Sequence, residues 1–457
     1  MNLERLSAAL GPAEVINGAP TEVTALAYDA RTVNPGALFF CVPGRRADGH
    51  AFAAAAAARG AAALVVERPL PLPLPQLLVA DARAAMPRAA VLFFGAPSRE
   101  LAVAAITGTN GKTTSAFLLH AILEASGRRS GLLTNIERRV GGAARPTGLN
   151  TPEAIDLQRL LREMVAAGDR ACVLEASSEA QVQGRLEGTS FAVLVFTNLT
   201  QDHLNFHGTM EAYFAAKAAL FAQAERAVIN VGGPFGARLA ARLPDAVCFD
   251  ADSEAIDGIG RRLRGRFNRE NAIGAALAAR ALGIEEDAIR AGIESVAGVP
   301  GRFEAIDEGQ RFVVLVDYAH TPEALERILA EARGLGDGRL TLVFGAGGDR
   351  DRSKRPRMGR AAAALADRAI LTSDNPRGED AEAIAAQVAA GAGRLELVLE
   401  LDRRTAIEQA LAEAGPGDVV VIAGRGAEPE QEFAGVKLPF DDREVARAAL
   451  RRLVART

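Results

Sequence analysis

Residues Ile106-Thr-Gly-Thr-Asn-Gly-Lys-Thr-Thr114 decide the fold class. They follow an apolar run that starts at Leu101 and open a helical stretch at 113–126, which is the context that a phosphate-binding loop requires. The glycines allow backbone N–H groups to wrap around phosphates, Lys112 reaches the terminal phosphates, and the Thr113 hydroxyl can bind Mg²⁺. The alternative is a glycine-rich turn with a solvated lysine, but the flanking strand and helix favour the phosphate loop.

Apolar runs and helical patterns alternate on both sides of this loop. Before it, strand-like runs lie at 37–42 and 61–66, with a proline-rich break at 69–75. After it, apolar runs at 171–175, 191–196 and 226–230 alternate with helical stretches at 152–167 and 209–222, and a helix pair spans 268–297. The helix at 152–167 is predicted to begin with Thr151 as N-cap and Pro152 as its first residue. This alternation is typical of a parallel, doubly wound sheet.

A second alternating block follows residue 299. Its apolar runs lie at 312–316, 340–344, 368–372 and 418–423, and its helical patterns at 321–334, 355–366, 380–392 and 403–413. We therefore predict an α/β protein with three domains: a small N-terminal α/β domain (1–96), a central phosphate-loop domain (97–298) and a C-terminal Rossmann-like domain (299–457).

Lysine is rare in this chain. Only Lys112, Lys217, Lys354 and Lys437 are found among 53 Lys and Arg residues. Since most cations here tolerate arginine, a lysine that persists is a candidate for work that a guanidinium cannot do, such as acting as a point charge on phosphate or losing a proton and reacting. Lys437 has no such context and is interpreted as a surface residue.

Composition limits the function classes. A hydrophobic content of 49% and a formal net charge of −4 indicate an ordinary soluble globular protein and argue against a nucleic-acid binder. Cys41, Cys172 and Cys248 are widely spaced in apolar runs and are expected to be small core residues of a reducing compartment. Without a signal region or a run of about 18 apolar residues, we expect a cytoplasmic protein with no membrane insertion.

Four further segments accompany the phosphate loop: Glu175-Ala-Ser-Ser178, Thr197-Asn-Leu-Thr-Gln-Asp-His203, Gly265-Arg-Phe-Asn268 with Asn271, and Asp317-Tyr-Ala-His-Thr-Pro322. In order and content the chain resembles the Mur ligases, which form amide bonds in peptidoglycan precursors. The resemblance covers essentially the whole chain and is closest to the MurE branch, which adds the third residue of the stem peptide to UDP-MurNAc-L-Ala-D-Glu.

The resemblance implies ATP and Mg²⁺ as cofactors and assigns site residues. Catalysis would fall to Lys112, Glu175, His203 and Lys217, and Mg²⁺ binding to Thr113, Glu175, His203 and Lys217. The implied ATP contacts are Gly108, Thr109, Asn110, Gly111, Lys112, Thr113, Thr114, Asn271, Arg302, Asp317, His320 and Lys354. From the residues alone, His320 is equally a capping or buried histidine, and Arg302 a surface arginine.

Lys217 lies in the helical run Tyr213-Phe-Ala-Ala-Lys-Ala-Ala-Leu-Phe221. The local sequence alone indicates a snorkelling lysine on an amphipathic helix, with its aliphatic chain on apolar surface and its ammonium in solvent. By resemblance it occupies the position of the family's carbamylated lysine. Carbamylation requires a neutral amine that captures CO₂, and arginine cannot undergo it.

The remaining implied contacts belong to the donor and the acceptor. The N-terminal domain resembles the UDP-binding one, and the UDP-MurNAc-peptide contacts would be Ala30, Thr151, Ser177, Gln183 and Arg185, although Ser177 and Arg185 could also be a cap and a surface residue. The Asp-Asn-Pro-Arg form of 374–377 resembles MurE enzymes that use meso-diaminopimelate, although a structural turn with an exposed arginine is the alternative. The implied amino-acid contacts are Arg350, Asp374, Asn375, Pro376, Arg377, Gly424 and Glu428.

The sequence departs from the family pattern at several positions. Ala30 replaces a usual serine, Glu179 a common histidine and Ala427 another histidine, and the stretch 250–265 is short enough to remove a hairpin. We expect an ATP-dependent ligase that works as a monomer on small molecules: ATP, UDP-MurNAc-dipeptide and a diamino acid. The alternatives are a ligase with another acceptor (L-lysine) or another donor, such as folylpolyglutamate synthetase, and an ATP-binding protein without ligase activity.

Overall fold

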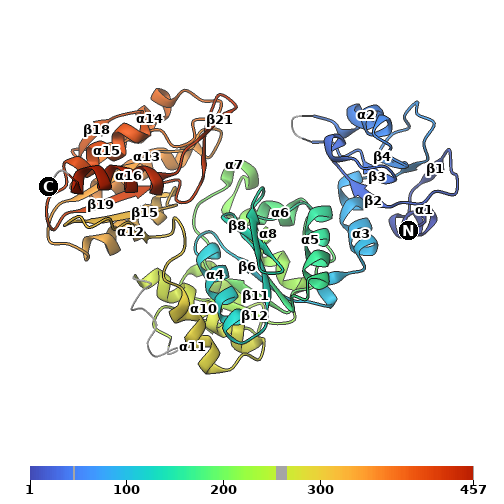
Figure 1. The fold of residues 1–457 in the computed structure, drawn as a ribbon, viewed down its shortest axis with the longest axis horizontal. Coiled ribbons are helices and arrows are strands. Elements are labelled where there is room, and N and C mark those ends of the chain that lie inside the picture. The colour runs from blue at the N-terminus through green and yellow to red at the C-terminus, as the bar shows by residue number, and fades with distance from the viewer. Residues whose placement is uncertain (45–46, 254–264, 456–457) are drawn as a thin grey trace.

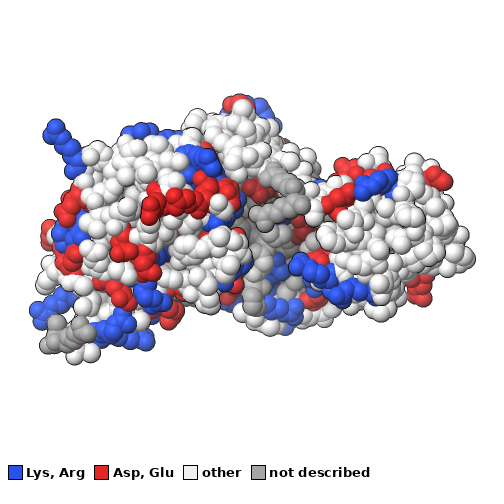
Figure 2. Space-filling view, turned by 90° about the horizontal axis from the view of Figure 1, so that it is seen from above, with Lys and Arg blue, Asp and Glu red and all other residues white. Residues whose placement is uncertain are grey.

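Three large sheets follow one another along the chain, and their domains are arranged with the central one between the other two (Figure 1). The computed structural model describes residues 1–44, 47–253 and 265–455. Acidic and basic side chains are interspersed over the face that Figure 2 shows. Among the described residues, no helix combines the length and the apolar character needed to cross a membrane.

The N-terminal sheet has the strand order β1-β5-β4-β3-β2, with β1 antiparallel and the others parallel. Its elements are α1 (Leu3–Leu10), β1 (Glu14–Ile16), β2 (Ala25–Ala27), η1 (Ala30–Thr32), β3 (Ala37–Phe40), η2 (Gly49–Phe52), α2 (Ala53–Ala58), β4 (Ala63–Val66), β5 (Gln76–Leu78), α3 (Ala82–Phe94) and η3 (Pro97–Arg99). Helix α3 packs against α5 (Ala154–Ala166) of the next domain and so joins the two.

The central sheet has the order β13-β12-β11-β6-β10-β7-β8-β9. Its elements are β6 (Ala102–Thr107), α4 (Lys112–Ala125), β7 (Ser130–Leu133), β8 (Glu137–Val140), β9 (Ala143–Pro146), α5 (Ala154–Ala166), β10 (Ala171–Glu175), α6 (Ser178–Val182), β11 (Val193–Phe196), α7 (Leu204–His207), α8 (Met210–Ala219), η4 (Leu220–Gln223), β12 (Ala227–Asn230), α9 (Pro234–Ala240), β13 (Val247–Phe249), α10 (Arg266–Ala281) and α11 (Glu286–Ser295). Strand β6 is buried on both faces: Ala104 and Ile106 pack with α4, α10 and α11, whereas Val103 and Ala105 pack with α5 and α8. This explains its continuous apolar run.

The C-terminal sheet has the order β14-β15-β19-β16-β17-β18, with β14 antiparallel. Its elements are β14 (Glu304–Ala305), β15 (Val313–Asp317), α12 (Pro322–Arg333), β16 (Leu340–Phe344), η5 (Arg352–Lys354), α13 (Arg355–Leu365), β17 (Arg368–Leu371), α14 (Ala381–Ala389), β18 (Glu396–Leu399), α15 (Arg403–Ala412), β19 (Val419–Ala423) and α16 (Asp442–Val454), and a hairpin of β20 (Glu430–Phe433) and β21 (Val436–Pro439) lies beside it. Helices α12 to α14 cover one face and α15 and α16 the other.

The predicted fold class is confirmed, while the domain boundaries 96/97 and 298/299 remain predictions. Two details of the sequence analysis are wrong. Helix α5 begins at Ala154 with Glu153 as N-cap, because the Thr151 hydroxyl is engaged elsewhere. Cys41 and Cys172 are buried as expected, but Cys248 is exposed on the edge strand β13. Most of the stretch 250–265, for which we predicted the loss of a hairpin, lies outside the described residues.

Candidate active site

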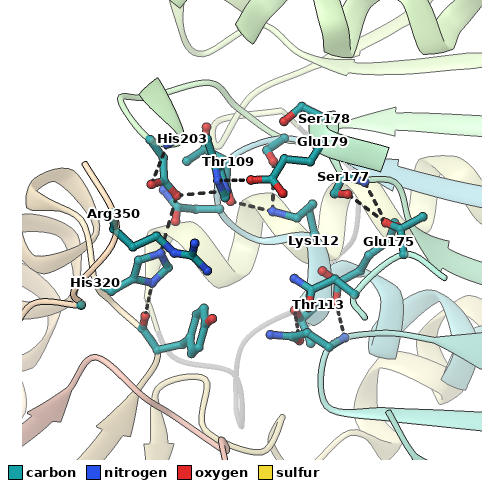
Figure 3. A pocket seen from close by; sticks show the side chains of 18 of the residues that line it. Thr109, Lys112, Thr113, Glu175, Ser177, Ser178, Glu179, His203, His320 and Arg350 are labelled. Atoms are coloured by element: carbon teal, nitrogen blue, oxygen red, sulfur yellow. Dashed lines mark hydrogen bonds and ion pairs between the residues drawn. The ribbon is translucent and has the colours of Figure 1, made fainter. Parts of the chain in front are cut away.

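The carboxyl ends of parallel strands from the central and C-terminal sheets enclose one cavity of about 380 Å³. Ligands commonly bind at this edge of an open α/β sheet. Figure 3 shows Lys112, Thr113 and Glu175 on the central-domain side, with Arg350 and His320 pointing toward them from the C-terminal domain. Most of the predicted site residues line this cavity. The exceptions are Ala30, Gln183, Asn271, Asp317 and Pro376.

The phosphate loop adopts its shape because two glycines permit it. Gly108 and Gly111 have φ values of +145° and +87°. A Cβ on Gly108 would lie 1.9 Å from Thr197 Oγ1, and one on Gly111 would lie 2.2 Å from Asn271 Oδ1. Asn271, predicted to contact ATP, therefore supports the loop from behind, where its Oδ1 also accepts a hydrogen bond from Ser115 at 3.4 Å.

Thr113 lies at the centre of a polar cluster. Its hydroxyl donates to Glu175 Oε1 at 2.8 Å and contacts Asn135 Oδ1 at 3.0 Å. Arg302, from the start of the C-terminal domain, donates through Nη2 to Thr113 Oγ1 at 3.1 Å. Glu175 is 1% exposed and also accepts from the Asn135 N–H. Sequence reasoning missed Asn135, whose strand connection carries no motif.

Lys112 and Lys217 meet on one carbonyl. Gly108 O accepts from Lys112 Nζ at 3.0 Å and from Lys217 Nζ at 2.8 Å. Lys217 is 1% exposed, and its ammonium position is 4.8 Å from the centre of the Tyr213 ring. Burial, followed by the nearby charge of Lys112, lowers the pKa of Lys217 well below its ordinary value. The geometry therefore favours a neutral amine at Lys217.

Asp202 joins the two domains and was not predicted as a site residue. Its carboxylate lies 3.7 Å from Lys354 Nζ, 3.6 Å from His320 Nε2 and 3.5 Å from His203 Nε2. Burial alone would raise the pKa of Asp202, but the hydrogen bond from His320 and the charges of Lys354 and His203 hold it well below its ordinary value. Its neighbour Gln201 donates to Asp351 and Ser353 of the C-terminal domain. The C-terminal domain is thus closed onto this loop.

Glu179, which replaces a histidine common in the family, lies against the predicted metal ligand His203. Its Oε1 is 3.2 Å from His203 Nδ1, and this hydrogen bond lowers the pKa of Glu179. His203 has a φ of +55°, a left-handed conformation that is uncommon for a residue with a side chain. Arg377, which lines the cavity from the C-terminal domain, and Asp349, next to Arg350, share that conformation. Such backbone strain concentrates at functional sites.

The predicted acceptor residues gather on the C-terminal side of the cavity. Glu428 accepts hydrogen bonds on both carboxylate oxygens, from the Tyr318 hydroxyl at 3.1 Å and from Asn375 Nδ2 at 2.9 Å. Asp374 is 7% exposed, and its Oδ2 has no hydrogen-bond partner among the described residues. Arg377 donates to Gly348 O at 2.7 Å. Two carboxylates with Arg350 and Arg377 make this side complementary to a group that carries both charges.

Buried arginines hold the loops of this acceptor side. Arg425 donates to Asn375 Oδ1 at 2.9 Å. Arg403 pairs with Asp442 through two hydrogen bonds of 2.7 Å, both side chains being fully buried, and donates to Ala423 O at the end of β19. Arg355 is a third buried arginine of this kind. It pairs with Glu379 at 2.9 Å and donates to Gly347 O, in the loop that leads to Arg350.

The predicted donor residues lie at the other end of the cavity. Thr151 Oγ1 donates to Glu175 O at 2.7 Å and contacts Ser177 Oγ at 3.1 Å. Arg185 donates to Thr151 O and forms an ion pair with Glu153 at 3.0 Å. Ser177 also caps α6, so the structural alternative for this residue holds alongside the functional one. Ala30 lies apart, in η1 of the N-terminal domain.

The donor set fits Mg²⁺, which prefers oxygen ligands. The hydroxyl of Thr113 and the carboxylate of Glu175 are adjacent, and the strand ends leave them facing the cavity. Within the described part of the chain, no group of three or more His, Cys, Asp and Glu side chains is placed to hold a metal ion. A magnesium ion here would therefore need ligands from the nucleotide, from water or from a modified lysine.

The fold and site define a class: phosphate-loop proteins whose nucleotide cavity is closed by a C-terminal α/β domain. Family models match three successive parts of the chain, described as "Mur ligase family, catalytic domain" (residues 22–106), "Mur ligase middle domain" (106–258) and "Mur ligase, glutamate ligase domain" (301–426). The chain belongs to the Mur ligase family, and the predicted family membership is confirmed.

Similar proteins narrow the branch. The chain is 42% identical to the UDP-N-acetylmuramoyl-L-alanyl-D-glutamate–2,6-diaminopimelate ligase of Geobacter metallireducens over 99% of both chains, and 43% identical to the ligase of the same name from Gloeobacter violaceus over 94% of both. A solved structure of a ligase of that name is 31% identical, with a TM-score of 0.63, over 97% of this chain and 98% of that one. MurF from Thermotoga maritima, solved in complex with ADP, shares the fold at 19% identity over 95% of this chain and 98% of that one (TM-score 0.66).

Proposed function

We propose that this protein is an ATP-dependent ligase that joins meso-diaminopimelate to the D-glutamyl carboxylate of UDP-MurNAc-L-Ala-D-Glu. One observation carries the proposal: a single cavity is lined by the phosphate loop, by Thr151, Ser177 and Arg185, and by Arg350, Arg377 and Glu428. Three substrates can therefore meet there. The relatives with more than 40% identity, which bear the name of this activity, support it.

In the first step, an oxygen of the donor carboxylate attacks the γ-phosphorus of ATP, and ADP leaves, giving an acyl phosphate. Lys112 and the loop N–H groups hold the phosphates and offset the charge on the transferred group. Lys112 already points along the loop, where it donates to Gly108 O and Thr109 O. Lys354 and His320 approach from the closed C-terminal domain. Closure excludes water, which would otherwise hydrolyse the acyl phosphate.

In the second step, the acceptor amine attacks the acyl carbon, loses a proton, and inorganic phosphate leaves. Asp374 Oδ2 is buried and has no hydrogen-bond partner in the described part of the chain, so it provides a site for an acceptor ammonium. Glu428 provides a second carboxylate for the distal ammonium, and Arg350 and Arg377 suit the distal carboxylate, because a guanidinium binds carboxylate through two parallel hydrogen bonds.

Bound Mg²⁺ would neutralise charge on the phosphates during transfer. Thr113 and Glu175 would hold one ion, and His203 together with Lys217 a second. Lys217 would contribute as a carbamate, since its pKa is lowered by burial and a neutral amine can capture CO₂. Among the described residues, no carboxylate lies within ion-pair distance of Lys217. Carbamylation would convert this side chain into an anionic metal ligand.

The acceptor side also bears on the alternatives. L-Lysine has a distal ammonium but no distal carboxylate, so it would offer Arg350 and Arg377 no carboxylate to bind. Folylpolyglutamate synthases resemble this chain at about 21% identity, which concerns the fold alone. We further propose that the enzyme is a cytoplasmic monomer.

The test is phosphate release from purified enzyme with ATP, Mg²⁺, UDP-MurNAc-L-Ala-D-Glu and one of meso-diaminopimelate, L-lysine or L-ornithine. We expect turnover with meso-diaminopimelate and a large loss of this preference in Arg377→Lys. The exposed Lys437→Arg variant is the matched control and should retain it. Preference for L-lysine would refute the acceptor assignment, and no turnover with any acceptor would refute the branch.

A further inference from the structure

Tyr318 touches both the nucleotide side and the acceptor side of the cavity. It follows strand β15, and the guanidinium carbon of Arg302 lies 4.2 Å from the centre of its ring. Its hydroxyl donates to Glu428 Oε1 at 3.1 Å. A single side chain therefore contacts one residue of each subsite.

On the nucleotide side, Arg302 contacts Thr113, the residue whose hydroxyl would bind a magnesium ion. Its Nη2 donates to Thr113 Oγ1 at 3.1 Å. If the Thr113 hydroxyl turns a lone pair toward a magnesium ion, the guanidinium cannot keep this bond, because both are cations that compete for one oxygen. The incoming phosphates offer the guanidinium a new anionic partner. Nucleotide binding thus acts directly on Arg302.

On the acceptor side, Glu428 is held by a short chain of contacts. Tyr318 bonds one carboxylate oxygen and Asn375 the other, and Asn375 is itself fixed by the buried Arg425. The segment before Arg302 approaches the loop that carries Glu428 closely. A Cβ on Gly426 would lie 3.1 Å from Tyr318 Cβ, and one at residue 301, next to Arg302, would lie 2.1 Å from the N atom of residue 427. The residue before Arg302 is therefore in direct contact with the loop that carries Glu428.

We propose that Tyr318 couples the two subsites: nucleotide binding fixes Arg302, the ring of Tyr318 follows, and its hydroxyl holds Glu428 in the position that receives the distal ammonium of the acceptor. Tyr318 is a positioning residue that acts through Arg302 and Glu428. The inference rests on the proposed function, because it uses a diamino acid as acceptor. Since ordering one subsite reduces the entropy cost at the other, nucleotide should tighten acceptor binding.

The experiment measures binding by calorimetry without the UDP substrate, so that no turnover occurs. The dissociation constant of meso-diaminopimelate is determined with and without saturating Mg²⁺ and a non-hydrolysable ATP analogue. We expect the analogue to tighten binding about fivefold or more in the wild-type protein, the lower bound of typical coupling energies. In Tyr318→Phe the ratio should fall below about twofold, because the hydroxyl that holds Glu428 is lost while the ring remains.

Tyr28→Phe is the matched control. It removes the same atom from a tyrosine whose hydroxyl bonds Asp156 at 2.6 Å between the N-terminal and central domains, and it should keep the wild-type ratio. Because coupling is reciprocal, the affinity for the analogue with and without acceptor must give the same ratio. An unchanged ratio in Tyr318→Phe, or no coupling in the wild-type protein, would overturn the inference. Phosphate release by the wild-type enzyme with meso-diaminopimelate separates the two claims. If turnover is seen but the coupling is not, only the role of Tyr318 is refuted; if no turnover is seen, the proposed function itself fails.

Discussion

Replacing Lys217 by methionine should lower turnover by orders of magnitude without unfolding the protein. Methionine has nearly the same length and no charge, so packing around this fully buried position is retained. Gly108 O loses one hydrogen bond but keeps the one from Lys112 at 3.0 Å, so no buried acceptor is left without a partner. The unfolding free energy should therefore change by no more than about 1 kcal/mol.

The effect on the reaction should be much larger. If the carbamate of Lys217 supplies an anion to the metal site, its loss removes charge stabilisation comparable to one preorganised catalytic contact, or roughly 10²- to 10³-fold in kcat. Lys217→Arg should also be inactive and should in addition be less stable, by about 3–5 kcal/mol, because a guanidinium without a counter-ion would be buried. Lys437→Met, at an exposed lysine paired with Glu430, is the control for both measurements.

Two assays check the chemistry directly. Wild-type enzyme in CO₂-free buffer should lose activity and regain it with bicarbonate, whereas Lys217→Met should respond to neither. The pKa of Lys217 is lowered in the folded protein, so the unfolded chain binds more protons between that pKa and 10.5. In CO₂-free buffer, the unfolding free energy of wild type relative to Lys217→Met should therefore rise with pH across this window. Phosphate release by Lys217→Met at the wild-type rate would refute the carbamate.

Three further outcomes test other parts of the structure. Asp442→Asn should lower the unfolding free energy of the C-terminal domain by about 3–5 kcal/mol in urea titrations, because it leaves the buried Arg403 charge unpaired; a change below about 1 kcal/mol would contradict this. The pKa of Glu379 is lowered to about 2, mainly by its bond from a buried arginine, so its stabilising contribution is present above 4.5 and is lost as the pH falls through 2; thermal midpoints of wild type and Glu379→Gln should converge over that range. Glu179→His should raise the Mg²⁺ concentration for half-maximal phosphate release about tenfold, since the carboxylate beside His203 is removed; an unchanged requirement would show that this carboxylate does not assist the metal site.

Helices and strands were predictable from the sequence where one face of the element, or the whole element, is buried. The run 340–344 coincides with β16, and the helical pattern at 355–366 differs from α13 by one residue. Parallel strands buried on both faces read as uninterrupted apolar runs, and amphipathic helices repeat at their own period, so both signals are strong. The edge strand β18, partly exposed along its length, lacks such a run and was missed.

The hairpin of β8 and β9 was also missed, although a signal was present. Gly141-Gly142 connects the two strands, both with positive φ, which is typical of a two-residue hairpin turn. The polar residues of β8 hid the strand: three of its four side chains are only partly buried, although β8 lies between β7 and β9 in the sheet. The N-cap of α5 failed for another reason: a tertiary contact of Thr151 with Glu175 O overrides the local capping preference.

Within the site, motifs predicted which residues gather but not how they pair. Arg302 and Thr113 are 189 positions apart, and Glu179 meets His203 only because α6 and α7 begin at the same edge of the sheet. Neither contact has a local sequence pattern. The resemblance to a family supplied the membership of the site, whereas the pairings depend on how the C-terminal domain closes.

The distribution of buried cations gives the scarcity of lysine a physical meaning. Burial by itself does not select lysine here, because three of the largest fully buried side chains are arginines: Arg355, Arg403 and Arg425. Each of them has a carboxylate or side-chain amide oxygen within hydrogen-bond distance. Lys217 is equally buried, but among the described residues its ammonium position bonds only a carbonyl and has no carboxylate within 4.0 Å. A guanidinium, which cannot lose its proton, would be unstable in that environment, whereas an amine can be neutral or can acquire a negative charge from CO₂. The chain therefore retains lysine at 217 because the position requires a nitrogen that can give up its charge.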